Sequence, residues 1–441
     1  MSPKQHNRQY DLVVYGATGY TGRYTARYVT THLPTNLRWA VAGRSQAKLE
    51  AVAAECAKLH PDRLPPAVEV VGRPEGPSAR AEEDELAGLA RKTFILITTV
   101  GPYGRLGEPA FRACAENGTH YLDVTGEVPF VARMLRRYEA AAAASGALMF
   151  PQIGIESAPP DLVAFALASA VRARYAASPT ADVVVSLHQL KGGPSGGTIA
   201  SALGLLENFS LSEVRAAYAP YALSPVPAPT RRPPRPEASL LSRLTGLVTV
   251  PHLGLLTTSP AGATDAAYVQ RSWGLLSSLP SRRETQAYGP NFSFREYMRP
   301  PRGGGWLSGF ATHLFLMVLG LVMATPVLRS LAKRWVGMQP GQGPEAETAE
   351  KDELEYRAVA TRDGGNGEKV LCRAGYKGSA YYFTGILAAE AAATILQEDL
   401  DLPGGVYTAA CLGQPYIDRL ERAGFRIETW PLEEKGWGDD M

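Results

Sequence analysis

The sequence predicts an α/β protein that begins with a doubly wound parallel sheet and continues into an α+β domain. Three observations carry this prediction. Short apolar runs alternate with helical patterns from the N-terminus to Asp161, as expected for strands covered by helices on both faces. A glycine-rich turn beginning at Gly16 follows the first apolar run. After Asp161 the alternation stops, and strand-like segments are separated by loops rich in proline and glycine.

Composition excludes several classes of protein. The 441 residues are 45% hydrophobic and 20% charged, an ordinary globular balance, and the net charge of +2 gives no reason to expect nucleic acid. The four cysteines lie far apart without a CxxC pair, which indicates reduced thiols. The seven histidines form no HExxH motif, so no metal is expected. The first apolar run is one strand long, and we therefore expect no secretion signal.

The first domain is predicted from six strands and the helices between them. Ser45 is placed as an N-cap, Pro109 begins a helix and Gly118 ends one. The helices are expected at 22–33, 45–60, 83–92, 109–118 and 128–146, and the strands at 10–16, 38–44, 67–72, 93–101, 120–126 and 148–154.

The second part of the chain gives weaker patterns. The proline-rich stretch 228–238 reads as a loop or linker, because proline cannot join a central strand. Strand-like alternation is seen at 264–276 and 291–298. Further strands are expected at 181–193 and 369–375, helices at 196–209 and 380–398, and a helix followed by a strand within 416–430.

The glycine turn reads "GATGYTG" and has the spacing GxxGxxG, a variant of the dinucleotide motif. One glycine allows the tight turn out of the strand, one lets the backbone approach a pyrophosphate, and one lets the helix pack closely on the sheet. The pyrophosphate would bind the helix N-terminus, where free N–H groups favour anions. The predicted cofactor-binding residues here are Gly16, Thr18, Gly19, Tyr20, Thr21 and Gly22.

The end of the second predicted strand distinguishes NAD from NADP. An acidic residue there would bind the ribose 2′-hydroxyl of NAD, whereas an arginine suits the 2′-phosphate of NADP. The sequence has Arg44 at this place, with Ser45 and Lys48 close behind, and no acid at the strand end. We therefore predict NADPH, against the alternative that Arg44 is a solvated loop residue.

Two further strand ends should lie at the same edge of the sheet, where ligands of doubly wound folds bind. Thr99, Val100, Gly101 and Pro102 follow the fourth strand and are predicted to border the cofactor. The candidates for proton transfer are Tyr103, Asp123 and Glu127. The alternatives are structural: Asp123 would anchor its loop, and Glu127 would cap the next helix.

Several strings together resemble the saccharopine dehydrogenase-like oxidoreductases, the family that includes the trans-acting enoyl reductases. They include "VVYGATGYTGR", "AGRSQAKL", "TTVGPYGRLGEP" and "GIESAPPDLVA", and the resemblance covers nearly the whole chain. It implies a Rossmann domain, an α+β substrate domain and a nicotinamide cofactor held by 16–22, Arg44 and 100–103. Where related sequences often read "GFDSIPxD", this chain has "GIESAPPDL", which keeps an acid as Glu156 together with Ser157 and Asp161.

A long hydrophobic segment lies in the second half of the chain. From Gly303 to Leu328 there is no Asp, Glu, Lys or Arg, and Arg329 follows at once. Its length could span a bilayer, but a single span would separate the tail from the rest of the fold. We therefore expect an interfacial or re-entrant segment, with a true span and a buried core helix as alternatives, and a place on the cytoplasmic face of a membrane or lipid droplet.

These observations predict an NADPH-dependent oxidoreductase that reduces an enoyl-type C=C bond of a hydrophobic polyketide, isoprenoid or acyl substrate. The expected partners are that substrate, a membrane or lipid surface and a pathway enzyme such as a polyketide synthase. The alternatives are a saccharopine-type amino-acid or imine dehydrogenase and a non-catalytic NADPH-binding membrane or lipid-droplet protein. The expected parts are a Rossmann domain (1–160), a substrate domain (161–300), the hydrophobic segment (301–340) and a C-terminal part that completes the fold (341–441).

Overall fold

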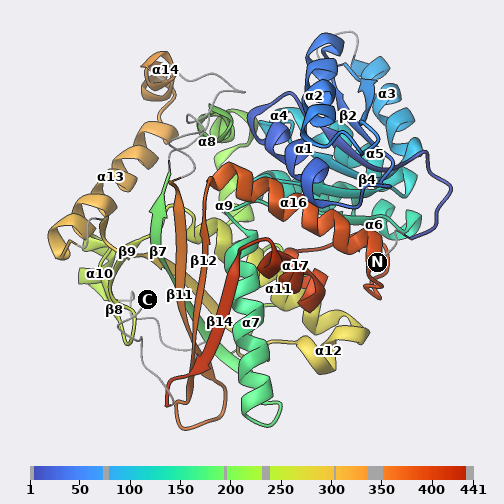
Figure 1. Cartoon of the computed structure of the whole chain (residues 1–441). Coiled ribbons are helices and arrows are strands. Elements are labelled where there is room, and N and C mark those ends of the chain that lie inside the picture. Colours follow the sequence, from blue (N-terminus) through green and yellow to red (C-terminus); the bar gives the residue numbers. More distant parts are fainter. Residues whose placement is uncertain are drawn as a thin grey trace.

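The computed structural model describes residues 4–72, 79–192, 196–230, 239–301, 304–335 and 351–433. Within these ranges the chain forms two seven-stranded sheets, each accompanied by helices (Figure 1). The expected α/β architecture with a parallel N-terminal sheet is confirmed. Of the tail expected to resemble the family, the stretch "PGQGPEAE" at 340–347 lies outside the described residues.

The first sheet is parallel throughout, and its strand order reverses direction beside β1, as in a doubly wound fold. All six predicted strands are present. A seventh strand, β13, pairs with β6 and comes from the far end of the chain. The order is β13 (Gly405–Val406), β6 (Leu148–Phe150), β5 (His120–Asp123), β4 (Thr93–Thr98), β1 (Tyr10–Tyr15), β2 (Trp39–Gly43) and β3 (Ala67–Val70).

Helices from both ends of the sequence accompany this sheet. α16 (Ala380–Gln397) lies beside α1 (Tyr20–His32), so closely that a Cβ on Gly385 would be 3.0 Å from the backbone nitrogen of Thr25 (Figure 1). The Tyr28 hydroxyl donates a 2.7 Å hydrogen bond to Glu390 across this contact. The other helices are α2 (Gln46–Leu59), α3 (Ala79–Lys92), α4 (Tyr103–Leu106), α5 (Glu108–Asn117) and α6 (Val128–Ser145).

The second sheet is mixed. β7 and β10 run parallel, and the other neighbouring strands pair antiparallel. α7 (Ala158–Arg174) leads from the first sheet into the second. The order is β14 (Arg426–Pro431), β12 (Lys369–Lys377), β11 (Glu353–Arg362), β7 (Thr180–Lys191), β10 (Ser293–Met298), β9 (Gly254–Thr258) and β8 (Val248–Val250).

One sequence-based expectation is wrong. The segment 264–276, read as strand-like, lies inside helix α11 (Gly262–Ser278). The helix is buried on nearly all sides, so its polar residues do not mark a solvent face. Instead, the Gln270 side chain accepts a hydrogen bond from the Tyr221 backbone, and Arg271 donates to the Leu223 carbonyl. Buried, partnered polar side chains remove the 3.6-residue period that would identify a surface helix.

The remaining helices belong to the second part of the fold. Most are short, and α9 begins with a full capping box between Ser210 and Glu213. They are α8 (Gly196–Asn208), α9 (Leu211–Ala217), α10 (Leu240–Thr245), α12 (Pro280–Gln286), α17 (Gly413–Arg422) and the 3₁₀ helix η4 (Ala409–Leu412).

The C-terminal residues contribute to both sheets. They supply β11, β12 and β14 to the second sheet and β13 to the first. The two sheets are joined through Asp161 of α7, which is completely buried. Its carboxylate accepts 2.6 Å from the Ser272 hydroxyl and 2.8 Å from the Ala410 backbone.

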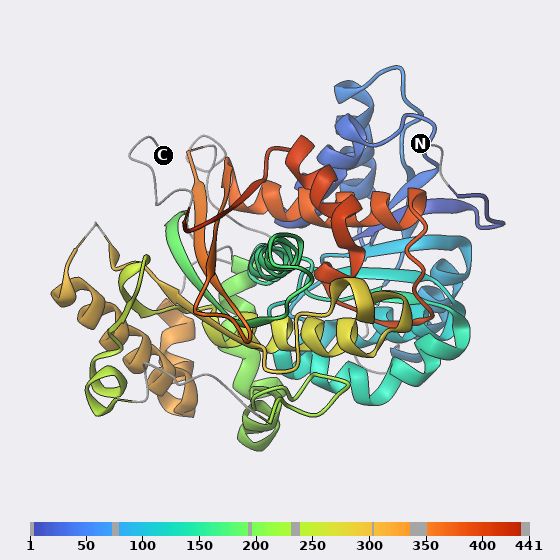
Figure 2. The ribbon, with the colours of Figure 1, turned by 90° about the horizontal axis from the view of Figure 1, so that it is seen from below.

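The hydrophobic segment forms α13 (Trp306–Ala324), followed by α14 (Pro326–Trp335). Both views place these helices at the edge of the second sheet, away from the first domain (Figures 1 and 2). The alternative of a buried core helix is wrong, because only Gly309 of α13 is buried. α13 is the one helix of the described residues that is long and apolar enough to cross a membrane by length and composition.

Candidate active site

The glycine turn packs against the end of β4. Gly16 has a φ of +88°, and a Cβ there would lie 2.8 Å from the Thr99 hydroxyl. A Cβ on Gly22 would lie only 2.2 Å from the Gly16 carbonyl oxygen. The Thr99 hydroxyl itself donates to the Gly16 carbonyl at 3.2 Å. The structure thus brings together three predicted cofactor residues, Gly16, Gly22 and Thr99. Their contacts are so close that only glycine is permitted at positions 16 and 22.

The N-terminus of α1 is open toward this turn. Gly19 is its N-cap, no side chain caps it, and its first turn carries no acid. Its first N–H groups are therefore available to an anion, as a bound pyrophosphate requires. Thr18 and Thr21 are partly exposed beside it. The ring of Tyr20 packs edge-on against Tyr381 at the start of α16, with 5.1 Å between ring centroids.

Arg44 directly follows β2, and the strand end runs beside the glycine turn, since the Gly16 N–H bonds the Ala42 carbonyl at 2.9 Å. The Arg44 side chain is exposed and makes no hydrogen bond or ion pair within the described parts of the chain. Ser45 caps α2 by position but makes no side-chain hydrogen bond as a cap. These residues fit an NADP ribose phosphate, and the role of Arg44 stays a prediction.

Tyr103 lies in the interior at the end of β4. Its hydroxyl donates a 2.9 Å hydrogen bond to the Thr98 carbonyl and is 3.4 Å from the Val124 backbone nitrogen. Burial raises the pKa of the Tyr103 hydroxyl well above its ordinary value, and the charge of Asp123 adds to this. The preceding residues Val100, Gly101 and Pro102 are partly exposed at the sheet edge.

Asp123 and Glu127 are also buried and partnered. Asp123 accepts hydrogen bonds from the backbones of Thr125 and Gln152, both at 2.9 Å, and from the Tyr121 hydroxyl at 2.8 Å. Burial raises the Asp123 pKa to about 6 despite these bonds. Asp123 therefore ties the end of β5 to the loop after β6, as its structural alternative expected.

Glu127 accepts 2.8 Å hydrogen bonds from the backbone nitrogens of Tyr103 and Gly104 and is also bonded by the Ser201 hydroxyl of α8. Burial raises its pKa, and these hydrogen bonds lower it in part. Glu127 precedes α6 as its N-cap residue but makes no capping bond there. Its carboxylate instead holds the first turn of α4. The structure thus brings Tyr103 and Glu127 together, while their roles in proton transfer stay predictions.

A group of four acids, which we call the acidic cluster, extends from this edge to the second sheet: Glu127, Glu156, Asp265 and Glu296. Burial, followed by the charge of Glu127, raises the pKa of Glu156. The Glu156 side chain nevertheless keeps solvent access, and a Cβ on Gly126 would lie 1.9 Å from its Oε2. Glu156 is thus an exposed side chain that packs closely against Gly126.

Asp265 of α11 and Glu296 of β10 form a carboxyl pair deeper in the cluster. Both are buried, and neither Asp265 oxygen has a hydrogen-bond donor among the described residues. Glu296 accepts 2.7 Å from the Ser259 hydroxyl through Oε1, while its Oε2 lacks a donor. Burial raises the pKa of Glu296 to about 7 and that of Asp265 well above its ordinary value, Glu296 adding to the latter. Burial and mutual repulsion therefore favour a pair that shares a proton over a pair of charged carboxylates.

Hydroxyl groups accompany the cluster, and cations do not. The Tyr218 hydroxyl lies 3.3 Å from that of Thr264 and is influenced by the charges of Glu156, Asp265 and Glu127. Burial raises the pKa of Tyr356 on β11, and the charges of Glu296, Asp265 and Glu156 add to this. Among the described residues, no Lys, Arg or His contributes to the pKa shift of any acid in the cluster. The charged groups that shift the pKa values of these acids are thus other acids.

Sequence reasoning noted Glu156 as a retained acid but missed the carboxyl pair. Asp265 was read as part of a strand, which gave no reason to connect it with Glu296. The one available signal is Asp265, which stands in the largely apolar segment "TDAAYV"; Glu296 directly follows the charged Arg295 in "FREYM" and gives no such signal. A charged residue in a buried segment is a candidate for function, because burial of a charge is costly.

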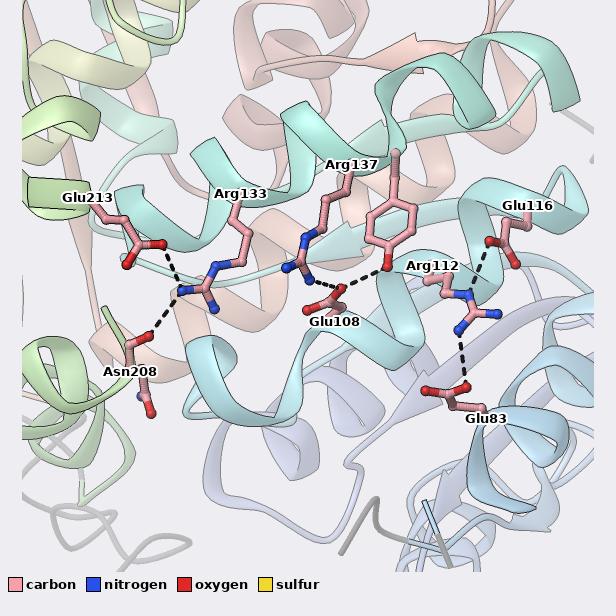
Figure 3. Close-up of polar contacts among 9 residues, drawn as sticks. Glu83, Glu108, Arg112, Glu116, Arg133, Arg137, Asn208 and Glu213 are labelled. Atoms are coloured by element: carbon pink, nitrogen blue, oxygen red, sulfur yellow. Dashed lines mark hydrogen bonds and ion pairs between the residues drawn. The ribbon is translucent and has the colours of Figure 1, made fainter. Parts of the chain in front are cut away.

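Polar contacts on α6 hold the second domain against this edge (Figure 3). Arg133 donates 3.1 Å hydrogen bonds to the Asn208 carbonyl and to Glu213, and its guanidinium lies 4.3 Å from the centre of the Phe209 ring. Phe209 in turn packs on α4, where a Cβ on Gly104 would be 2.6 Å from its ring. These contacts position α8 and α9 over the loop that carries Tyr103.

Comparisons with known proteins agree with this geometry. Residues 12–149 match the family model described as saccharopine dehydrogenase NADP binding domain. A Mycobacterium tuberculosis protein, provisionally named a trans-acting enoyl reductase, is 32% identical to this chain and covers 96% of it and 98% of its own length. A trans-acting enoyl reductase of Mycobacterium leprae is 28% identical, with 98% of this chain and all of the relative covered.

A similar fold occurs in a solved structure. The apo saccharopine dehydrogenase (L-Glu forming) of Saccharomyces cerevisiae superposes with a TM-score of 0.50 over 95% of this chain and 99% of its own, at 12% identity. At this identity the likeness concerns the fold alone.

Proposed function

Because this chain belongs to the family of the trans-acting enoyl reductases and is an NADP-dependent oxidoreductase, we propose that it reduces a C=C bond conjugated to a carbonyl in an uncharged, hydrophobic acyl, polyketide or isoprenoid chain. The observation that supports this substrate class is the acidic cluster. A substrate of the saccharopine type carries several carboxylates and would need cations, whereas the main causes that shift the pKa values of the cluster's acids are burial, other acids and hydrogen bonds.

The reaction needs a hydride and a proton. NADPH supplies the hydride when it is bound along the glycine turn. This chain's residues orient the substrate and supply the proton to the carbon next to the one that receives the hydride. The polar atoms of Tyr103, Asp123 and Glu127 are already bonded by backbone groups and by the hydroxyls of Tyr121 and Ser201. We therefore assign proton supply to the carboxyl pair of Asp265 and Glu296, with solvent returning the proton by way of Glu156.

We also propose a polyketide synthase as the partner. The relatives are named as acting in trans, and an unsaturated acyl chain held by such a synthase is a substrate of the stated kind.

The test follows NADPH consumption with trans-2-enoyl thioesters of increasing chain length, reading product masses. We expect a gain of two mass units, a rate that rises with chain length, and a preference for NADPH over NADH. Turnover only with an amino acid and a keto acid would replace this proposal by the saccharopine-type reaction. NADPH binding without turnover of either class would favour the non-catalytic alternative.

A substitution of Arg44 tests the cofactor preference separately. Arg44→Ala should weaken NADPH binding by roughly tenfold to a hundredfold, since a charge-assisted bond contributes about 1.5–3 kcal/mol, and leave NADH binding unchanged. Lys58→Ala, which removes an exposed positive charge from the far end of α2, is the matched control. Equal weakening of both cofactors would contradict the role of Arg44.

A further inference from the structure

Exposed apolar side chains gather on three helices, α10, α13 and α14, which we call the apolar face. Of the 20 large hydrophobic residues exposed in the described chain, 15 lie on these helices. A single exposed leucine is ordinary, but a contiguous group this large marks an interaction site. The most exposed members are Leu240, Leu241, Leu244, Leu307, Phe315 and Val327, followed by Leu321.

The apolar face is held by a narrow polar seam. The Thr257 hydroxyl of β9 donates a 2.7 Å hydrogen bond to the Gly309 carbonyl, and the Thr258 hydroxyl lies 2.8 Å from Nδ1 of His313. α10 joins the seam at its end, since a Cβ on Gly246 would meet the His313 ring at 2.3 Å. These contacts fix one side of α13 and leave the remainder of an apolar helix turned outward.

The charged residues on these helices and next to them in the sequence are of one sign. The sequence has no Asp or Glu between Glu237 and Asp265, nor between Glu296 and Glu345. These two stretches contain all three helices. Arg243 of α10 and Arg299 before α13 are exposed, and Lys333 and Arg334 follow in the sequence. The acid that reaches these helices in space is Glu207 of α8, which is ion-paired with Arg329 of α14 at 3.5 Å. An apolar surface whose own helices carry only basic residues complements a bilayer with anionic headgroups.

The fold favours lying on a bilayer over crossing it. A helix of 19 residues is about 28 Å long, enough to span. However, β10 precedes this segment in the sequence and β11 follows it. Both strands pair with β7, one on each side of it. α16, further along, packs on α1. A single crossing would pull these neighbours to opposite sides of the membrane.

We propose that α10, α13 and α14 dock this protein peripherally on a lipid bilayer with anionic headgroups, with α13 lying in the plane of the interface. Trp306 at the start of α13 is suited to the headgroup level, where tryptophan is favoured. This proposal stands independently of the substrate proposed above, since it uses none of the residues of the cofactor edge or the acidic cluster.

The test is co-flotation of the full-length protein with vesicles of phosphatidylcholine alone and with 30% phosphatidylglycerol, a composition of about one anionic lipid in three. We expect binding to the anionic vesicles that weakens as salt rises. The variant Leu307→Ser/Phe315→Ser/Leu321→Ser should lose at least about tenfold in binding. The control Leu59→Ser/Leu64→Ser/Leu211→Ser changes exposed leucines elsewhere and should bind like wild type, and an unchanged NADPH affinity in all three proteins would show intact folding.

A second readout places the contact. Tryptophan emission should shift to the blue on anionic vesicles, and the shift should be smaller in Trp306→Phe, which leaves Trp335 of α14 as the other tryptophan of these helices. Absence of vesicle binding by wild type, or equal binding by the two triple variants, would overturn the proposal. So would resistance of the bound protein to alkaline carbonate, which indicates a span, or a wild-type dimer that only the apolar-face variant breaks, which indicates a second copy as the occupant.

Discussion

The backbone nitrogen of Tyr103 donates a 2.8 Å hydrogen bond to Oε1 of Glu127, so two residues predicted as proton donors hold each other in place. The Tyr103 hydroxyl is engaged as well, donating to the Thr98 carbonyl. This arrangement orders the loop that borders the cofactor edge. It leaves neither group free to meet a substrate in the described structure.

We expect Tyr103→Phe to lower stability by about 1–3 kcal/mol, because the Thr98 carbonyl loses its donor in a buried place, and to keep kcat within a few fold. Tyr121→Phe is the control, since it likewise removes a buried hydroxyl, which donates a 2.8 Å bond to Asp123. Thermal unfolding and NADPH turnover measure both effects. A hundredfold loss of kcat confined to Tyr103→Phe, at unchanged NADPH affinity, would restore Tyr103 as the donor.

Gly22 should be the most sensitive position of the cofactor turn. Gly22→Ala places a Cβ 2.2 Å from the Gly16 carbonyl oxygen, which forces α1 away from the turn and should weaken NADPH binding at least about tenfold. Gly88→Ala in α3 is the control, because its nearest neighbour would be 4.0 Å away. Titration of NADPH by fluorescence compares the two, and comparable affinities would show that the close packing is not required for the cofactor.

The sequence predicts the cofactor edge well for a physical reason. The tight turn, the closely packed helix and its open N-terminus are all determined by neighbouring residues. Glycines at 16, 19 and 22 indicate them within a stretch of seven residues. The acidic cluster has no such record. Glu156, Asp265 and Glu296 come from three segments separated by many residues, and only the packing of α11 against β10 brings the last two together. β13 is missed for a related reason: two residues carry no periodicity, and its pairing with β6 depends on the whole fold.

The contacts of Arg133 should matter more than those of its neighbour Arg112 (Figure 3). Arg133 is mostly buried and links α6 to α8 and α9, whereas the pairs of Arg112 with Glu83 and Glu116 are exposed on both sides. Exposed pairs contribute little to stability. Arg133→Ala should therefore increase hydrogen exchange in α8 and α9 by roughly tenfold, and Arg112→Ala should leave it unchanged. Equal exchange in the two variants would show that α8 is held by apolar contacts alone.

The carboxyl pair predicts a specific dependence of stability on pH. Glu296 has a pKa of about 7 in the folded protein, above its ordinary value, so the folded state binds this proton more tightly than the unfolded state. Its contribution is therefore fully present below about pH 4.5 and is lost as pH rises to about 7. In Glu296→Gln this loss is absent. The fall in unfolding free energy between pH 5 and pH 8 should be smaller in the variant, by on the order of 2 kcal/mol.

Activity provides the second half of this prediction. If the pair supplies the proton, Glu296→Gln should lower kcat by about 10²-fold or more while the NADPH Kd stays the same. Glu50→Gln, which alters an exposed carboxylate on α2, should change neither kcat nor the pH profile. Chemical denaturation at several pH values measures the stability arm, and stopped-flow oxidation of NADPH with an enoyl thioester measures the other. Parallel pH profiles for wild type and Glu296→Gln would contradict the shared proton, and an unchanged kcat would leave the pair a structural element of the second domain.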